Sequence, residues 1–139
     1  MWGSSILKTW SKTQATIALS SGEAELAAVV KGATEALGMQ AVLRDLGHEV
    51  KLHIRSDATA AIGMVKREGL GRVRHLAVAD LWVQQRVRCS DIAVSKVAGA
   101  DNPSDICTKG VDRGTLTKHM ANLMMMPAEG RHHLAPALS

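Results

Sequence analysis

Three stretches of the chain alternate apolar or β-branched residues with polar ones, which is the pattern of a half-buried β-strand. They cover residues 6–19, 50–56 and 92–97. The second stretch is the most regular, because its apolar positions alternate with basic residues throughout. The pattern therefore predicts three short strands spread along the chain.

Over most of the remaining chain, apolar residues recur at roughly helical spacing. The longest run begins after Ser20, a residue type that favours helix N-caps, and ends at Gly47. Gly32 and Gly38 lie inside this run and weaken the helix, each by up to ~1 kcal/mol relative to Ala. Shorter helices are predicted over residues 57–67, 72–87, 102–109 and 112–126.

The order of these elements is strand, helix, strand, helix, helix, strand, helix, helix. Strands separated by helices imply parallel pairing through crossover connections, so we expect an α/β fold. In such sheets, active sites lie at the carboxyl ends of the strands. One domain over residues 4–126 accounts for the pattern, and residues 127–139 are expected to form a frayed tail.

Composition narrows the function only slightly. The chain has 139 residues, and its 17 Lys and Arg against 13 Asp and Glu give a net charge of +4. That charge fits a polyanionic partner, but many soluble domains carry as much. Two isolated cysteines indicate neither a disulfide framework nor a zinc site. With no secretion signal and no apolar run near the ~20 residues needed to cross a bilayer, we expect an intracellular protein without a membrane partner.

Candidate chemistry comes from three carboxylates on separate predicted elements: Glu25, Asp57 and Asp105. Mg²⁺ prefers carboxylate and water oxygens, and two such ions can hold the attacking and leaving oxygens of a phosphodiester. The three residues suit such a site if the fold brings them together.

Helix chemistry offers a structural explanation for most of these acidic residues. Glu23 falls three residues after Ser20 and completes a capping box, whereas Glu25 lies ~200° further round the helix and cannot do so. Asp57 could be the N-cap of the helix that it precedes. Asp105, three residues after Asn102, could be half of a capping pair. Both interpretations are kept for Asp57 and Asp105.

Basic residues gather at the start of one predicted helix, where positive charge opposes the helix dipole. They are Arg72, Arg74 and His75. Because the dipole does not favour this placement, two interpretations are kept: a phosphate contact, and a solvated charged surface, which is the commoner case.

Four segments resemble motifs of the ribonuclease H domain of copia-type retrotransposon Pol polyproteins, and they occur in the same order. Residues 10–25 (WSKTQATIALSSGEAE) resemble the family's W-S-x-x-Q-x-T-V-A-x-S-S-x-E-A-E segment. The other three segments are residues 56–61 (SDATAA), 72–76 (RVRHL) and 102–109 (NPSDICTK), the last resembling N-P-A-D-x-x-T-K.

This resemblance implies a ribonuclease H-like mixed sheet with flanking helices, and Mg²⁺-dependent hydrolysis of RNA in RNA–DNA hybrids. By motif position, Glu25, Asp57 and Asp105 would be catalytic metal ligands for two Mg²⁺ ions, with Glu23 outside the site. Arg72, Arg74 and His75 would face the nucleic acid, which such proteins recognise mainly by backbone and shape.

The chain departs from the family at its beginning. The family has a further acidic motif on its first strand, and its aspartate bridges both metals, whereas no Asp or Glu precedes Glu23 here. We therefore expect a module without its first two strands, with crippled activity and at most weak Mg²⁺ binding, unless an upstream reverse transcriptase segment completes it. A smaller departure is Ala77, where the family often has Asp. A non-catalytic nucleic-acid-binding remnant is the alternative function.

Overall fold

A computed structural model covers the chain, and it describes residues 1–3, 5–11, 20–69 and 78–126. The chain divides into two compact units. The smaller unit combines Met1–Lys12 with Pro103–Ser139, and the larger is Thr13–Asn102. Each unit is described by itself.

The larger unit is a mixed α/β structure. Its elements are α1 (Ser21–Asp45), β1 (Leu52–Ser56), α2 (Thr59–Lys66), α3 (Val78–Arg88), β2 (Ile92–Lys96) and the 3₁₀ turn η1 (Gly99–Asp101). In the smaller unit, the described elements are the 3₁₀ helix η2 (Pro103–Cys107) and α4 (Arg113–Asn122).

Strands β1 and β2 form a two-stranded parallel sheet, in a register that runs from Leu52 opposite Ile92 to Ser56 opposite Lys96. The parallel pairing predicted from the order of elements is therefore confirmed. The strand predicted over residues 6–19 is wrong for residues 6–11, which are described and carry no strand; residues 12–19 lie outside the described part. Strand pairing needs a partner from elsewhere in the chain, so a local pattern cannot secure it.

Helix α1 begins and ends as its sequence predicts. The Ser20 hydroxyl oxygen accepts a hydrogen bond from the Glu23 amide at 3.3 Å, which satisfies one free N–H group of the first turn. At the other end, the Gly47 amide donates to the Arg44 carbonyl at 2.9 Å and the His48 amide to the Leu43 carbonyl at 2.8 Å. Gly47 has φ +84°, so this is a Schellman motif, which needs a residue that tolerates the left-handed region.

Other boundaries shift by a few residues. Helix α2 begins at Thr59 rather than residue 57, and α4 begins at Arg113 with Asp112 as its N-cap. The α-helix expected over residues 102–109 is wrong in kind: the structure has the 3₁₀ helix η2 there, over five residues, too few for a stable α-helix without further support. Residues 72–77 of the helix predicted to end at 87 lie outside the described part, and α3 accounts for the rest.

A small aliphatic core holds the larger unit together. Its buried residues come from the three helices and β2, and partly buried Leu52 and Ile54 of β1 and Trp82 of α3 pack against them. Because the chain has no Phe or Tyr, this core is built from Val, Leu, Ile and Ala. The buried members are Leu26, Val29, Ala33, Ala61, Ile62, Val65, Val83, Ile92 and Val94.

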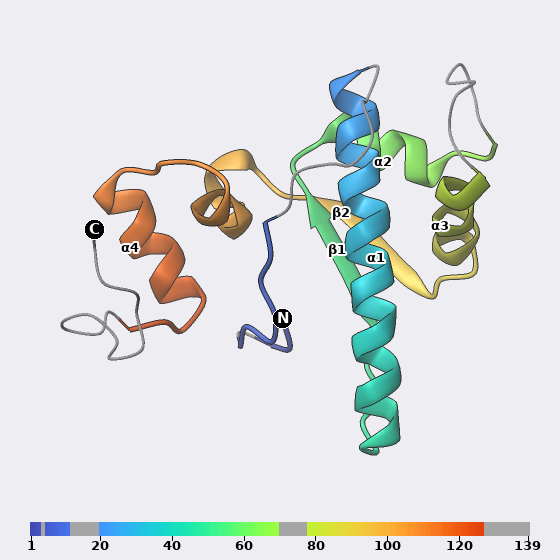
Figure 1. Ribbon diagram of the computed structural model, residues 1–139, viewed down its shortest axis with the longest axis horizontal. Helices are drawn as coiled ribbons and strands as arrows, with labels where there is room; N and C mark the ends of the chain where they lie inside the picture. Colours follow the sequence, from blue (N-terminus) through green and yellow to red (C-terminus); the bar gives the residue numbers. More distant parts are fainter. Residues whose placement is uncertain (4, 12–19, 70–77, 127–139) are drawn as a thin grey trace, which may run out of the picture. The chain divides into compact units, whose positions relative to one another are not determined.

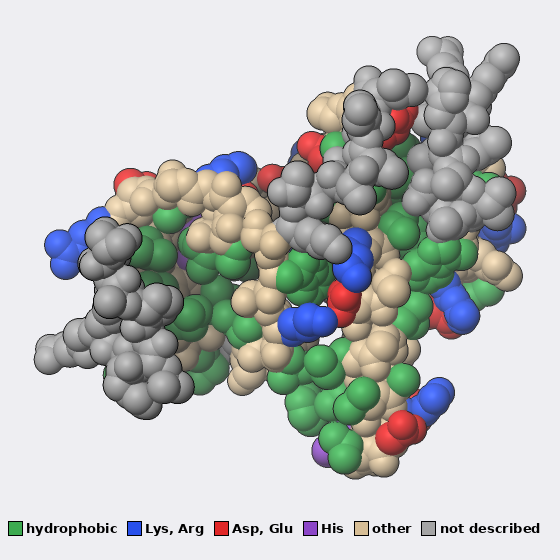
Figure 2. All heavy atoms as spheres, viewed as in Figure 1, with side chains coloured by type: hydrophobic (Ala, Val, Ile, Leu, Met, Phe, Trp, Pro, Cys, Tyr) green, Lys and Arg blue, Asp and Glu red, His purple; other side chains and the backbone are tan. Residues whose placement is uncertain are grey.

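Helix α1 is also the one described helix that is long and apolar enough to cross a membrane by length and composition. This corrects the expectation that no apolar run approaches that length. Core helices pass the same test, and α1 contributes Leu26, Val29 and Ala33 to the core. Figures 1 and 2 show that its C-terminal part extends beyond the sheet with hydrophobic side chains at the surface, where Val42 and Leu46 are 54% and 69% exposed.

Candidate functional site

Asp57 lies directly after the carboxyl end of β1, and it does not cap the helix that follows. The N-cap of α2 is Ala58, which makes no side-chain capping bond. The hydroxyl of Ser56 accepts the Ala58 amide at 3.1 Å instead. The interpretation of Asp57 as an N-cap is therefore wrong, because α2 begins at Thr59 and its N-cap position falls on Ala58.

The Asp57 carboxylate faces the chain that leaves the neighbouring strand. It is exposed, and its Oδ2 atom is 3.9 Å from the point where a Cβ atom on Gly99 would lie. Gly99 follows β2 by three residues, so the side chain lies where both parallel strands end. It forms no hydrogen bond or ion pair with the described part of the chain, which leaves both oxygens available.

Glu25 belongs to the second turn of α1 and is exposed. The start of α1 packs closely on α2: a methyl group at Gly22 would lie 3.3 Å from Ala60 Cβ and 3.1 Å from Met64 Cε. Figure 1 shows α1 beginning and β1 ending at the same end of this unit. The start of α1, which carries Glu25, and the end of β1, which Asp57 follows, therefore belong to the same end of the larger unit, and a shared site for the two carboxylates stays a prediction.

Asp105 belongs to the smaller unit, in η2, and has a partner there. The Lys109 ammonium nitrogen is 3.0 Å from Asp105 Oδ1, and the Asp105 side chain is 21% exposed. The Asp-to-Lys spacing of four residues is a known signal for such pairs, which the sequence analysis did not use. The meeting of Asp105 with Glu25 and Asp57 stays a prediction.

Glu25 and Asp57 are exposed carboxylates without a described partner. Carboxylate oxygens are the ligands that hard cations such as Mg²⁺ prefer, so these two residues have the right chemistry for such an ion. Within the described ranges, no group of three or more His, Cys, Asp and Glu side chains is arranged to hold a metal ion. A magnesium site built from Glu25, Asp57 and Asp105 therefore stays a prediction too.

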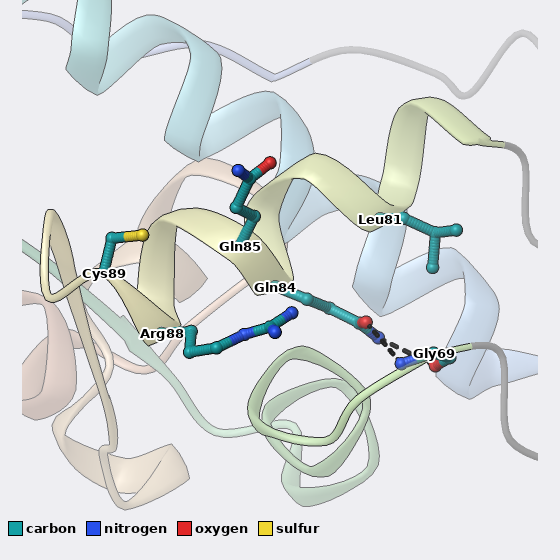
Figure 3. A pocket seen from close by; sticks show the side chains of 6 residues that line it. All are labelled: Gly69, Leu81, Gln84, Gln85, Arg88 and Cys89. Atoms are coloured by element: carbon teal, nitrogen blue, oxygen red, sulfur yellow. Dashed lines mark hydrogen bonds between the residues drawn. The ribbon is translucent and has the colours of Figure 1, made fainter.

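Arg72, Arg74 and His75 lie outside the described residues, but the residue that leads into them is held in a defined place. Gly69 is bound by the side chain of Gln84, which reaches it from α3 (Figure 3). Sequence reasoning missed Gln84, because a single polar residue among apolar helix positions carries no functional signal by itself.

A shallow pocket of about 410 Å³ lies beside this contact, lined by Gly69, Leu81, Gln84, Gln85, Arg88 and Cys89 (Figure 3). The Arg88 guanidinium is 3.4 Å from the Glu68 carboxylate, and both side chains are largely exposed. Exposed ion pairs of this kind contribute little free energy. Of the polar groups that line the pocket, the Gln84 amide is already engaged with backbone groups and the Arg88 guanidinium with Glu68.

Comparison with known proteins places the sequence in context. No protein-family model matches the chain, and no solved structure matches it. Over 105 residues, or 74% of its length, the chain is 31% identical to the retrovirus-related Pol polyprotein from transposon TNT 1-94 of Nicotiana tabacum. The aligned segment is 8% of that polyprotein. The chain is thus similar to a short piece of a retrotransposon Pol polyprotein, which supports an origin of its sequence in such an element.

Proposed function

We propose that this chain is a ribonuclease H-like module of a copia-type retrotransposon, descended from an enzyme that hydrolyses RNA in RNA–DNA hybrids. The position of Asp57 is the observation that carries the proposal. This carboxylate lies at the carboxyl ends of two parallel strands, has no capping role, and is free of described partners. The relationship to a retrotransposon Pol polyprotein supports the same ancestry.

Glu25, Asp57 and Asp105 are the residues that would hold Mg²⁺ in this proposal. Bound Mg²⁺ would stabilise the charge that develops on the scissile phosphate. Glu25 and Asp57 supply oxygen ligands without breaking any described contact. Asp105 would have to give up its contact with Lys109 in order to bind the cation. This cost would lower its contribution to metal binding.

The proposed activity of residues 1–139 on their own is low. These residues hold no Asp or Glu before Glu23, so a protein made of them alone has three of the carboxylates and not the metal-bridging aspartate of the family. Loss of one preorganised electrostatic group costs about 10²–10³-fold in rate, and loss of a ligand shared by two ions should cost more. The basic residues Arg72, Arg74 and His75 are proposed to contact the nucleic-acid backbone.

Metal binding and cleavage test this proposal together. Mn²⁺, a spectroscopic substitute for Mg²⁺, should bind weakly to the purified chain, as measured by electron paramagnetic resonance, and Asp57→Asn should abolish this binding. Asp45→Asn is the matched control, because Asp45 is exposed and lies in the last turn of the same helix that carries Glu25 near its start. Equal losses from both variants, or no binding by the parent chain, would contradict the proposal.

Cleavage is measured on an end-labelled RNA–DNA hybrid with Mg²⁺ present. We expect cleavage that is slow, dependent on Mg²⁺ and absent in Asp57→Asn. Turnover at an ordinary enzymatic rate would show that the chain does not lack an essential ligand.

A non-catalytic nucleic-acid binder is the second candidate, favoured by the net charge of +4. It predicts salt-sensitive binding to the hybrid that persists in EDTA and in Asp57→Asn, together with no Mg²⁺-dependent cleavage. Slow Mg²⁺-dependent cleavage that disappears in Asp57→Asn would favour descent from the enzyme.

A further inference from the structure

The two faces of the β1–β2 sheet differ sharply in character. Leu52 and Ile54 of β1 are partly buried and pack against the core of the larger unit, whereas His53 and Arg55 are exposed. Lys51 immediately precedes the strand at the matching position and is also exposed. Because side chains alternate between faces, these three basic residues follow one another along the outer face of the sheet. We call them the basic row: Lys51, His53 and Arg55.

The neighbouring strand leaves the basic row accessible. The register places small residues beside it, with Ala93 opposite His53 and Ser95 opposite Arg55. The Nε2 atom of His53 is 2.8 Å from the Ser95 hydroxyl, a contact that orients the imidazole across the two strands. No bulky side chain of β2 therefore covers the row.

The charges around the row leave it positive. Glu49 precedes it and Asp57 follows it, but both lie outside the paired strands. Asp91, which lies before β2, is held by Arg86 at 2.9 Å. Within the described part of the chain, the charged groups of Lys51 and Arg55 have no ion-pair partner. Two fixed positive charges and an imidazole thus lie along one line.

The spacing of this line matches a polyanion. A strand rises ~3.3 Å per residue, so alternate side chains lie ~6.6 Å apart. This is comparable with the distance between neighbouring phosphates along a nucleic-acid strand. A single anionic group would be served by one cation, whereas two cations with an imidazole between them fit a repeating charge.

We propose that the basic row binds the phosphate backbone of one nucleic-acid strand, with Ser95 as a positioning residue for His53. Such contacts fix the register of a nucleic acid on the protein and carry no base specificity. The row ends two residues before Asp57 but does not use the carboxylates of the proposed metal site and requires no metal, so it extends the proposed function without depending on it.

Fluorescence anisotropy with a labelled RNA–DNA hybrid in EDTA tests this proposal over a series of KCl concentrations. The double variant Lys51→Gln/Arg55→Gln should bind more weakly than the parent chain. For a duplex, each lost phosphate contact lowers the slope of log K against log salt by about 0.9, so two lost contacts should lower it by about 1.8.

Arg44→Gln/Lys66→Gln is the matched control, because it removes the same charge from the ends of α1 and α2, where both side chains are exposed. It should leave the slope unchanged. A second control, Lys51→Arg/Arg55→Lys, keeps the charges and should keep the affinity. Equal losses in the two Gln pairs, or an unchanged slope in Lys51→Gln/Arg55→Gln, would overturn the proposal. Because EDTA removes any metal contribution, failure here is distinct from failure of the proposed nuclease ancestry.

Discussion

The side-chain amide of Gln84 binds both backbone groups of Gly69. Its Oε1 atom accepts the Gly69 amide hydrogen at 3.0 Å, and its Nε2 atom donates to the Gly69 carbonyl at 3.1 Å. The same nitrogen donates to the Met64 carbonyl at 2.8 Å. Gln84 is 6% exposed, so these three hydrogen bonds satisfy a buried amide and connect α3 to the loop that follows α2.

Gln84→Ala should lower the free energy of unfolding by about 1–3 kcal/mol, since it removes three part-buried hydrogen bonds to the backbone of Gly69 and Met64. Urea denaturation measures this change, and hydrogen exchange at the Gly69 amide should accelerate with it. The control is Gln85→Ala, which alters the exposed neighbour on the same helix and should change stability by less than about 0.5 kcal/mol. Similar losses for both variants would mean that the amide does not hold the loop.

Gly22 is the glycine of α1 that packing requires. A larger side chain there would press on Ala60 and Met64, so Gly22→Val should destabilise the fold by about 1–3 kcal/mol. Gly38→Val is the matched control on the same helix, because nothing lies within 4 Å of a Cβ atom at Gly38. Thermal unfolding should show a lower midpoint for the first variant and an equal or higher one for the second. Equal midpoints would contradict the close contact of α1 with α2.

Ser56 and Asp57 should differ in their effects on stability. Ser56→Ala removes the hydroxyl that accepts the Ala58 amide and should cost about 0.5–1.5 kcal/mol. Asp57→Ala should change stability by less than about 0.5 kcal/mol, because the carboxylate has no described structural partner. Chemical denaturation of the two variants checks this order. The reverse order would restore Asp57 as the helix cap and weaken its candidacy as a metal ligand.

Asp112 should make the start of α4 sensitive to acid. The Thr115 hydroxyl and then the Thr115 amide lower the pKa of the Asp112 carboxylate below its ordinary value. Since the folded form has the lower pKa, the cap contributes its full stability above the ordinary Asp pKa of about 3.9 and loses it as the pH falls through the folded pKa. NMR titration of Asp112, with amide exchange at Thr115, measures this loss.

Thr115→Val removes the largest cause of that shift, so the pKa of Asp112 should rise towards its ordinary value. The control is Thr117→Val, whose hydroxyl donates to the Arg113 carbonyl rather than to Asp112. It should leave the Asp112 titration unchanged. If neither substitution changes the pKa of Asp112, the Thr115 hydroxyl is not the cause of the lowered pKa.

Local interactions explain what could be read from the sequence. Ser20 and Gly47 mark the ends of α1 because a cap and a Schellman turn involve only residues within a few positions of the helix end. The alternation over residues 50–56 predicted the end of β1 at Ser56, although the strand begins two residues later than expected, and the order of strands and helices predicted parallel pairing. These features depend on the neighbours of each residue in the chain, which the sequence gives directly.

Only the tertiary structure excluded Asp57 as a helix cap and gave Gln84 its contacts. By residue type, a helix cap was the more common role for Asp57, and the N-cap position on Ala58 became visible only in the folded backbone. Gln84 gained its role from Gly69, fifteen positions away, through burial that no local pattern reports. The basic row likewise became a surface only when β2 placed small side chains beside it. In each case the contact that defines the residue's role depends on how the chain folds, because hydrogen bonding and burial depend on distances in space and not on positions in the sequence.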